Sequence, residues 1–205
     1  MSNDLRLYAP SAVRNREPIA RVLRQYLPET GLVLEVASGS GEHFVHFATD
    51  ARPGLTFQPS DPDAAARASI DAWVAATGLR NVRPALTLDG TSGSWPIDRA
   101  DLVVCINMIH ISPWAATLGL MRGAGKVLSS GGCLVLYGPY RQGGRHTAPS
   151  NEVFDHDLRT RNPAWGVRDL EDVVAVAIGN GFSQPDVHAM PANNLLLAFA
   201  RAHRD

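Results

Sequence analysis

The segment from Val33 to His43 constrains the fold of this chain more than any other. It reads Val-Leu-Glu-Val-Ala-Ser-Gly-Ser-Gly-Glu-His, an apolar run followed by two closely spaced glycines and the beginning of a helix. Glycines at 39 and 41 leave bare backbone that a ligand can approach, and a helix N-terminus presents unpaired N–H groups to an anionic group. A strand, a glycine turn and a helix in this order predict a nucleotide-type cofactor site.

The turn departs from the phosphate-binding fingerprint of dinucleotide enzymes. That fingerprint has a third glycine three residues after the second, where this chain has Phe44. Glu35 lies in the strand, four residues before Gly39, and a carboxylate so near would repel a pyrophosphate but not a cationic sulfonium ligand. A carboxylate within an apolar strand also needs a buried partner or a function.

The remaining chain alternates strand and helix patterns. Strands are predicted at 32–37, 55–59, 82–88, 101–107, 133–137, 185–190 and 195–202, and helices over 42–49, 62–77, 112–128 and 169–178. Another helix is predicted to begin at Pro18, and Asp61 and Ser112 stand where caps are expected. The pattern predicts an α/β fold: a Rossmann-like, doubly wound, seven-stranded sheet, mostly parallel with an antiparallel C-terminal strand.

Length and charge limit the possible classes of protein. The 205 residues fit a single domain, 1–205, in which 1–31 is predicted to form an N-terminal lid and helix and 138–168 a substrate loop. The formal net charge of −1 argues against nucleic acid as partner. The sequence has no leader-like or membrane-spanning apolar run, and Cys105 and Cys133 lack CxxC spacing, so a cytoplasmic protein with reduced thiols is expected.

The Glu35–Gly41 pattern resembles motif I of class I S-adenosylmethionine (SAM) methyltransferases. That resemblance implies SAM as cofactor, with S-adenosylhomocysteine as its product. The acid after the second strand, Asp61, would hold the ribose hydroxyls, unless it is only a helix cap. Asp89, after the third strand, would accept from the adenine amino group, unless it is only a turn residue. The cofactor-binding residues so implied are Glu35, Ala37, Gly39, Gly41, Asp61, Asp89, Asn107 and Met108.

Longer strings resemble a particular family over nearly the whole chain. They include residues 9–19, 34–42, 58–61, 107–114, 138–140, 150–155 and 162–166. The chain is similar to the uncharacterised group called domain of unknown function 938, whose animal members are named methyltransferase-like protein 26. The resemblance implies a class I fold and SAM binding, but no settled substrate.

Candidates for chemistry follow the fourth and fifth predicted strands. His110 would lie at the rim where donor and acceptor meet, with a pKa suited to a general base, or else it packs against the next helix. Tyr140 is the other catalytic candidate. A second group comprises His146, Glu152 and Asp155, with arginines at 141, 145, 159, 161 and 168 that either clamp an anionic substrate or lie scattered on the surface.

The N-terminal segment supplies further candidates. Tyr8 and the run 14–16 are predicted to fold over the pocket, where Asn15 or Arg16 would meet the carboxylate of SAM. His43 and His46 have HxxH spacing, but a metal needs three or four ligands, so they are interpreted as helix-packing residues and no metal is expected.

The sequence favours methyl transfer from SAM to a small molecule, with the acceptor and the oligomeric state open. One alternative is a dinucleotide oxidoreductase, against which Phe44 and Glu35 argue. Others are a SAM-binding partner or sensor without activity, and methylation of a macromolecule. Sequences typical of P-loop kinases, serine hydrolases and zinc proteases are absent.

Overall fold

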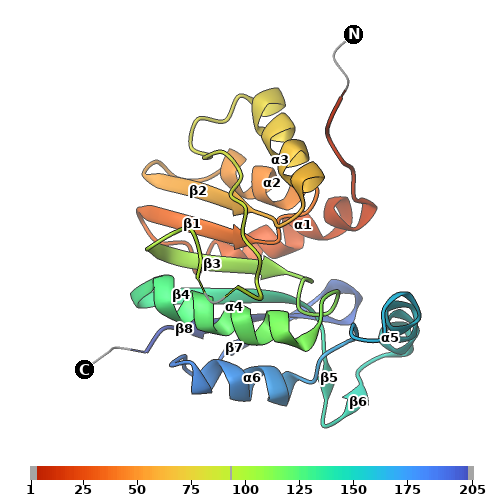
Figure 1. Cartoon of the computed structure of the whole chain (residues 1–205). Coiled ribbons are helices and arrows are strands. Elements are labelled where there is room, and N and C mark those ends of the chain that lie inside the picture. The colour runs from red at the N-terminus through yellow and green to blue at the C-terminus, as the bar shows by residue number, and fades with distance from the viewer. Residues whose placement is uncertain (1–3, 93, 203–205) are drawn as a thin grey trace.

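Six strands form the central sheet in the computed structural model, which describes residues 4–92 and 94–202 (Figure 1). In spatial order they are β2 (Leu55–Ser60), β1 (Gly31–Val36), β3 (Ala100–Ile106), β4 (Leu128–Pro139), β8 (Asn194–Ala200) and β7 (Asp186–Met190). The first four pair in parallel, whereas β8 is antiparallel to both of its neighbours. The predicted sheet type, with an antiparallel C-terminal strand, is confirmed.

Helices cover both faces of the sheet because its strands are apolar on both sides. On one face α1 (Pro10–Leu23) and α2 (Glu42–Thr49) pack against Val33 and Leu102, with Phe44 and Phe47 of α2 in the core. On the other face α4 (Trp114–Val127) and α6 (Leu170–Gly179) cover residues that include Leu34. The third helix, α3 (Ala64–Thr77), lies beside α2 (Figure 1).

The strand order places a switch point between β1 and β3. From β1 the chain moves outward to β2 and then returns to the other side of β1 as β3. The helices that follow these two strands therefore leave in opposite directions, and a crevice opens at the carboxyl ends of the strands. Glu35 and Asn107 lie at these ends, so the topology brings the glycine turn and the residues after β3 to one edge.

The prediction of seven strands is wrong by one. The segment 82–88 makes only isolated bridges to β2, Phe57 with Val82 and Ser60 with Leu86. Pro59 in β2 lacks the N–H that would continue the ladder, and the register shifts there, because Leu86 N and not Ala85 N donates to the Pro59 carbonyl. The segment follows the sheet edge without becoming a regular strand.

Two predicted helix starts are also corrected. The first helix begins at Pro10, so Pro18 lies inside it and not in its first turn. The helix after residue 112 is capped by Pro113, and the Ser112 hydroxyl instead donates to the Met108 carbonyl at 2.7 Å.

The segment 138–168, predicted as a loop, contains regular structure. It forms a hairpin of β5 (Arg141–Gln142) and β6 (Arg145–His146), followed by the helix α5 (Pro149–Arg161). The weak apolar pattern of α5 explains the error, because only Asn151, Asp155 and Leu158 of this helix are buried. Among the described residues, no helix combines the length and the apolar composition needed to cross a membrane.

Candidate functional site

The turn between β1 and α2 is built on residues with left-handed backbone. Ala37, Gly39 and Gly41 have φ angles of 59°, 57° and 91°. A Cβ at Gly41 would stand 3.0 Å from the Cα of Ile70 in α3, so a side chain there would push the helices apart. A Cβ at Gly39 would meet nothing within 4 Å. The turn thus packs closely on α3 at one glycine and leaves open space above the other.

Glu35 carries its carboxyl group into the protein at the end of β1. The residue is 2% exposed, and Oε2 has no hydrogen-bond partner among the described residues. Burial raises the pKa of this carboxyl to about 8, and the charge of Asp61 adds to the rise, while a hydrogen bond with Ser38 opposes it. The ionised form therefore needs a cation close by.

Asp61 follows β2 and faces the glycine turn. Its Oδ2 accepts a hydrogen bond from Gly39 N at 3.0 Å, and its Oδ1 accepts one from Asp63 N at 2.9 Å. The prediction that Asp61 caps the next helix is wrong, because α3 begins at Ala64 and the Asp63 carboxylate accepts from Ala66 N at 2.8 Å. Each carboxylate oxygen has two acceptor positions, so Asp61 retains one on each oxygen for a ligand.

The candidates beyond the next two predicted strands differ in their surroundings. Asp89 is exposed, and its Oδ1 accepts from the backbone and hydroxyl of Thr91 at 2.8 and 2.9 Å, as its interpretation as a turn residue predicts. Asn107 has a φ of 60° and lines a cavity. Met108 is buried, and its Sδ lies 3.3 Å from the Ser112 hydroxyl. Of these three, Asn107 lines that cavity, whereas Asp89 and Met108 do not.

Helix α1 brings Asn15 to the same edge. His43 Nε2 lies 2.7 Å from Asn15 Oδ1, and the Asn15 side chain lowers the pKa of Tyr137 of β4, against the larger rise that burial causes. Burial lowers the pKa of His43 to about 4, and the positive charges of His46 and Arg16 contribute to this. Arg16 is half-buried on the same helix. Because α1 includes residues 14–16, these side chains are held on a helix and not on a flexible lid.

His110 and Tyr140, the two catalytic candidates, are both 0% exposed. Their rings meet edge to face with centroids 5.0 Å apart. His110 Nδ1 accepts a hydrogen bond from Arg168 N at 3.3 Å, and burial lowers the pKa of this imidazole to about 3. The expectation that His110 lies at the rim is wrong, because the backbone at Gly138 covers Nε2: a Cβ there would stand inside contact distance of that atom.

A cavity of about 560 Å³ opens at the carboxyl ends of β3 and β4, between α1, α5 and the short helix η1 (Pro191–Asn193). This volume is typical of small-molecule sites. The residues that line it are Ser11, Arg14, Asn15, Asn107, Tyr137, Pro139, Ser150, Asn151, Phe154, Pro191, Ala192 and Asn194. Sequence reasoning missed Tyr137, Phe154 and Asn194 as site residues. Proline at 149 was an available signal, since it is favoured in the first turn of a helix that would carry Phe154.

Several of the second group of candidates bind one another or the backbone beside them. The Asp155 carboxylate accepts from Val167 N at 2.7 Å and from Arg159 Nε at 3.1 Å, and lies 3.4 Å from His146 Nε2. Arg168 donates to three backbone carbonyls. These groups fix the return of the chain from α5 to α6.

The described part of the N-terminal segment lies along α3. Leu7 N donates to the Ser69 hydroxyl at 2.7 Å, and Trp73 Nε1 donates to the Leu7 carbonyl at 3.0 Å. Ala9 N donates at 2.5 Å to Glu42, which lies directly after the glycine turn. The predicted lid, 1–31, thus contacts both helices beside that turn; its residues 1–3 lie outside the described residues.

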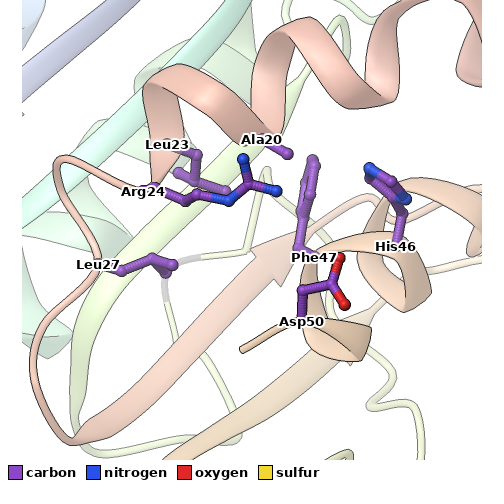
Figure 2. Close-up of a pocket in the computed structure, with 7 residues that line it drawn as sticks. All are labelled: Ala20, Leu23, Arg24, Leu27, His46, Phe47 and Asp50. Carbon is purple, nitrogen blue, oxygen red and sulfur yellow. The ribbon is translucent and has the colours of Figure 1, made fainter. Parts of the chain in front are cut away.

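A much smaller cleft lies between α1 and α2 (Figure 2). Its lining comprises Ala20, Leu23, Arg24, Leu27, His46, Phe47 and Asp50. It encloses about 20 Å³, roughly the room for one water molecule. His46 Nε2 is 3.1 Å from Glu17 Oε2 here, and within 4–92 and 94–202 no three metal-ligating side chains converge. This cleft is no candidate for a substrate site.

Solved structures share this fold. The chain is similar to the apo form of the SAM-dependent methyltransferase SibL (TM-score 0.77, 20% identity, 94% of this chain and 56% of that one). It is also similar to an O-methyltransferase family protein from Burkholderia thailandensis (TM-score 0.81, 17% identity, 95% of this chain and 58% of that one). A third similar structure is that of CalO1, a methyltransferase in calicheamicin biosynthesis, in its SAH-bound form (TM-score 0.75, 17% identity, 94% of this chain and 54% of that one). The chain spans a little over half the length of each.

A family model matches almost the entire chain. The match runs from residue 6 to residue 201 and therefore includes the glycine turn, the switch point and every residue that lines the large cavity. The resemblance inferred from the longer sequence strings is confirmed, and the chain belongs to the family described as protein of unknown function (DUF938).

Proposed function

We propose that this chain binds SAM over the ends of β1, β2 and β3 and transfers its methyl group to a small molecule in the large cavity. The observation that carries the proposal is the buried Glu35 carboxyl, whose Oε2 has no partner among the described residues, directly before a glycine turn at the switch point. Such an acid calls for a cation from outside the chain.

The residues at this edge fit the chemistry of SAM. Its ammonium and sulfonium groups are cationic, as Glu35 requires, and its ribose has two adjacent hydroxyls that suit the two free acceptor positions of Asp61. The bare backbone at Gly39 lets the ligand approach closely. When bound, SAM supplies a methyl group on a good leaving group, so this chain has mainly to align the acceptor and exclude water.

The cavity is the proposed acceptor site. Asn15 and Asn107 both line it, and both also lie close to the glycine turn. Asn15 contacts His43 in the helix after that turn, and Asn107 follows β3, the strand beside β1. The segment 138–168 contributes its outer wall through α5, and α1 contributes the opposite wall. The proposal assigns these two segments to enclosing the acceptor, and it assigns no proton transfer to His110 or Tyr140, which are buried.

The comparisons support methyl transfer over the alternatives. Proteins of similar fold are described as SAM-dependent methyltransferases, and one was solved with S-adenosylhomocysteine. A dinucleotide oxidoreductase is disfavoured because Phe44 stands where the third glycine is needed and packs in the core against Phe57, with ring centroids 5.4 Å apart.

Calorimetric titration with SAM, S-adenosylhomocysteine and NAD tests the cofactor. We expect the first two to bind and NAD not to bind. Asp61→Asn should weaken SAM roughly 10- to 100-fold, as expected for lost charge-assisted hydrogen bonds. Asp50→Asn is the matched control, because Asp50 is exposed and follows α2 at the end of that helix remote from the glycine turn. Failure of SAM and S-adenosylhomocysteine to bind would refute the proposal, and SAM binding without turnover of any acceptor would favour a sensor or partner protein.

A further inference from the structure

We infer that the methyl acceptor is a carboxylic acid with an apolar body, held through its carboxylate by Arg14 and methylated on oxygen. This inference rests on the proposed function and adds the substrate class. It comes from the composition of the cavity: a single cation, apolar surface between neutral amide and hydroxyl side chains, and no group on its lining suited to removing a proton.

Arg14 is the charged residue among those that line the cavity. None of the salt bridges between described residues involves it, whereas Arg24, directly after the same helix, pairs with Glu17 at 3.7 Å. A guanidinium presents paired donors that match a carboxylate. The cavity therefore attracts an anion and offers it a two-point contact.

The walls fit an apolar body. Phe154, Pro139, Pro191 and Ala192 contribute apolar surface, and Phe154 remains 37% exposed. Several of the amides are already engaged; Asn151 Nδ2, for example, donates to Thr147 Oγ1 at 3.1 Å and to a backbone carbonyl at 2.9 Å. The cavity volume of about 560 Å³ accommodates an aromatic or medium-length aliphatic acid.

The lining, as described, contains no Asp, Glu, His, Lys or Cys side chain. Its phenol, Tyr137, is buried, and burial raises the pKa of this hydroxyl, so it keeps its proton at neutral pH. His110 is covered by the backbone at Gly138, Tyr140 is fully buried, and His43 Nε2 is taken by Asn15. A hydroxyl or ammonium acceptor needs a base to take its proton during transfer. A carboxylate does not, because it is already ionised at neutral pH.

The step balances without a proton acceptor. A carboxylate oxygen attacks the methyl carbon of SAM; the C–O bond forms as the C–S bond breaks, and the sulfur keeps the electron pair. The products are a methyl ester and neutral S-adenosylhomocysteine, and no proton is released. The two-point contact of Arg14 keeps the carboxylate aligned, and the attacking oxygen uses its remaining lone pair.

The test uses the full chain with SAM and matched acceptors on one body: 2-naphthoic acid, 2-naphthol, 2-naphthalenethiol and 2-naphthylamine, with decanoic acid and 1-decanol as an aliphatic pair. S-adenosylhomocysteine is quantified and products are identified by mass. We expect methyl esters from the acids, with kcat at saturating SAM changing less than threefold from pH 6 to 9. Arg14→Ala should raise the Kd of 2-naphthoate, titrated with S-adenosylhomocysteine present, about 10- to 100-fold. Arg14→Lys should recover part of this loss, and Arg21→Ala, exposed on the same helix outside the cavity, should change nothing.

The outcomes separate this inference from the proposed function. Turnover of the naphthol, thiol or amine but not the acids would overturn the carboxylate acceptor and leave methyl transfer standing. SAM binding without turnover of any acid would also overturn it. An unchanged Kd of 2-naphthoate in Arg14→Ala would remove Arg14 as anchor. Failure to bind SAM at all would instead remove the proposed function.

Discussion

The affinity for SAM should rise steeply with pH in the acidic range, because Glu35 must lose its proton to pair with a cation. Burial is the main cause of the raised pKa of about 8, so in the free protein the carboxyl is mostly protonated at neutral pH. Binding a cationic ligand against it stabilises the ionised form. Ligand binding and proton release from Glu35 are therefore coupled.

The size of the effect follows from that pKa. An acid with a pKa of about 8 is ionised in roughly one molecule in a thousand at pH 5 and in one of ten at pH 7. If SAM binds with Glu35 ionised, its affinity should increase roughly 100-fold between these pH values, about 3 kcal/mol. The ammonium of SAM has an ordinary pKa near 8, so it stays charged over this range and does not offset the gain.

Calorimetric titration at pH 5, 6 and 7 measures this, and each titration in two buffers of different ionisation enthalpy counts the protons released. Glu35→Gln keeps the side-chain shape, removes the titration, and should give an affinity that is independent of pH. A wild-type affinity that stays constant within threefold, with no proton release, would refute the assignment of Glu35 as the partner of a cation.

Three further predictions concern stability and closure. The free energy of unfolding of wild type should fall relative to that of Glu35→Gln by roughly 3–5 kcal/mol from pH 4.5 to 8, because a raised folded-state pKa gives stability that is lost as pH rises. Denaturant titrations at the two pH values in which this change is less than 1 kcal/mol would contradict the prediction. His110→Gln should lose less stability than wild type as the pH falls below 6.5. The pKa of the buried imidazole is lowered to about 3, so folded wild type resists protonation there and its free energy of unfolding decreases. Equal acid sensitivity of the two proteins would count against this. Trp73→Phe removes the donor to the Leu7 carbonyl and should speed SAM dissociation several-fold in stopped-flow without lowering Tm; an unchanged rate would argue against the N-terminal segment as a lid.

Much of the fold could be predicted because its strands are apolar on both faces and its turns carry distinctive residues. The glycine turn, the strands on either side of the switch point and the C-terminal hairpin all have local signals. The segment 82–88 did not follow its apolar pattern, because Pro59 in β2 has no N–H to continue the hydrogen bonding between them. The effect of this proline on a distant segment is visible only when the pairing is known.

The cofactor side of the candidate site was also more predictable than the acceptor side. Glu35, Gly39 and Asp61 lie within or next to strand ends, and topology alone brings them to one edge. The cavity instead depends on α5, a helix with a weak apolar pattern, and on η1 at the far end of the chain. His110 shows the limit of spacing arguments, since its position after β3 was correct but its side chain points into the core.

A crystal structure of the protein with S-adenosylhomocysteine tests the central claim most directly. We predict that the ribose hydroxyls lie within about 3.2 Å of the Asp61 carboxylate and the ammonium within the same distance of Glu35, with the sulfur facing the cavity lined by Asn15 and Asn107. A ligand bound elsewhere, or a site that stays free of it at millimolar concentration, would contradict the assignment of this edge as a SAM site.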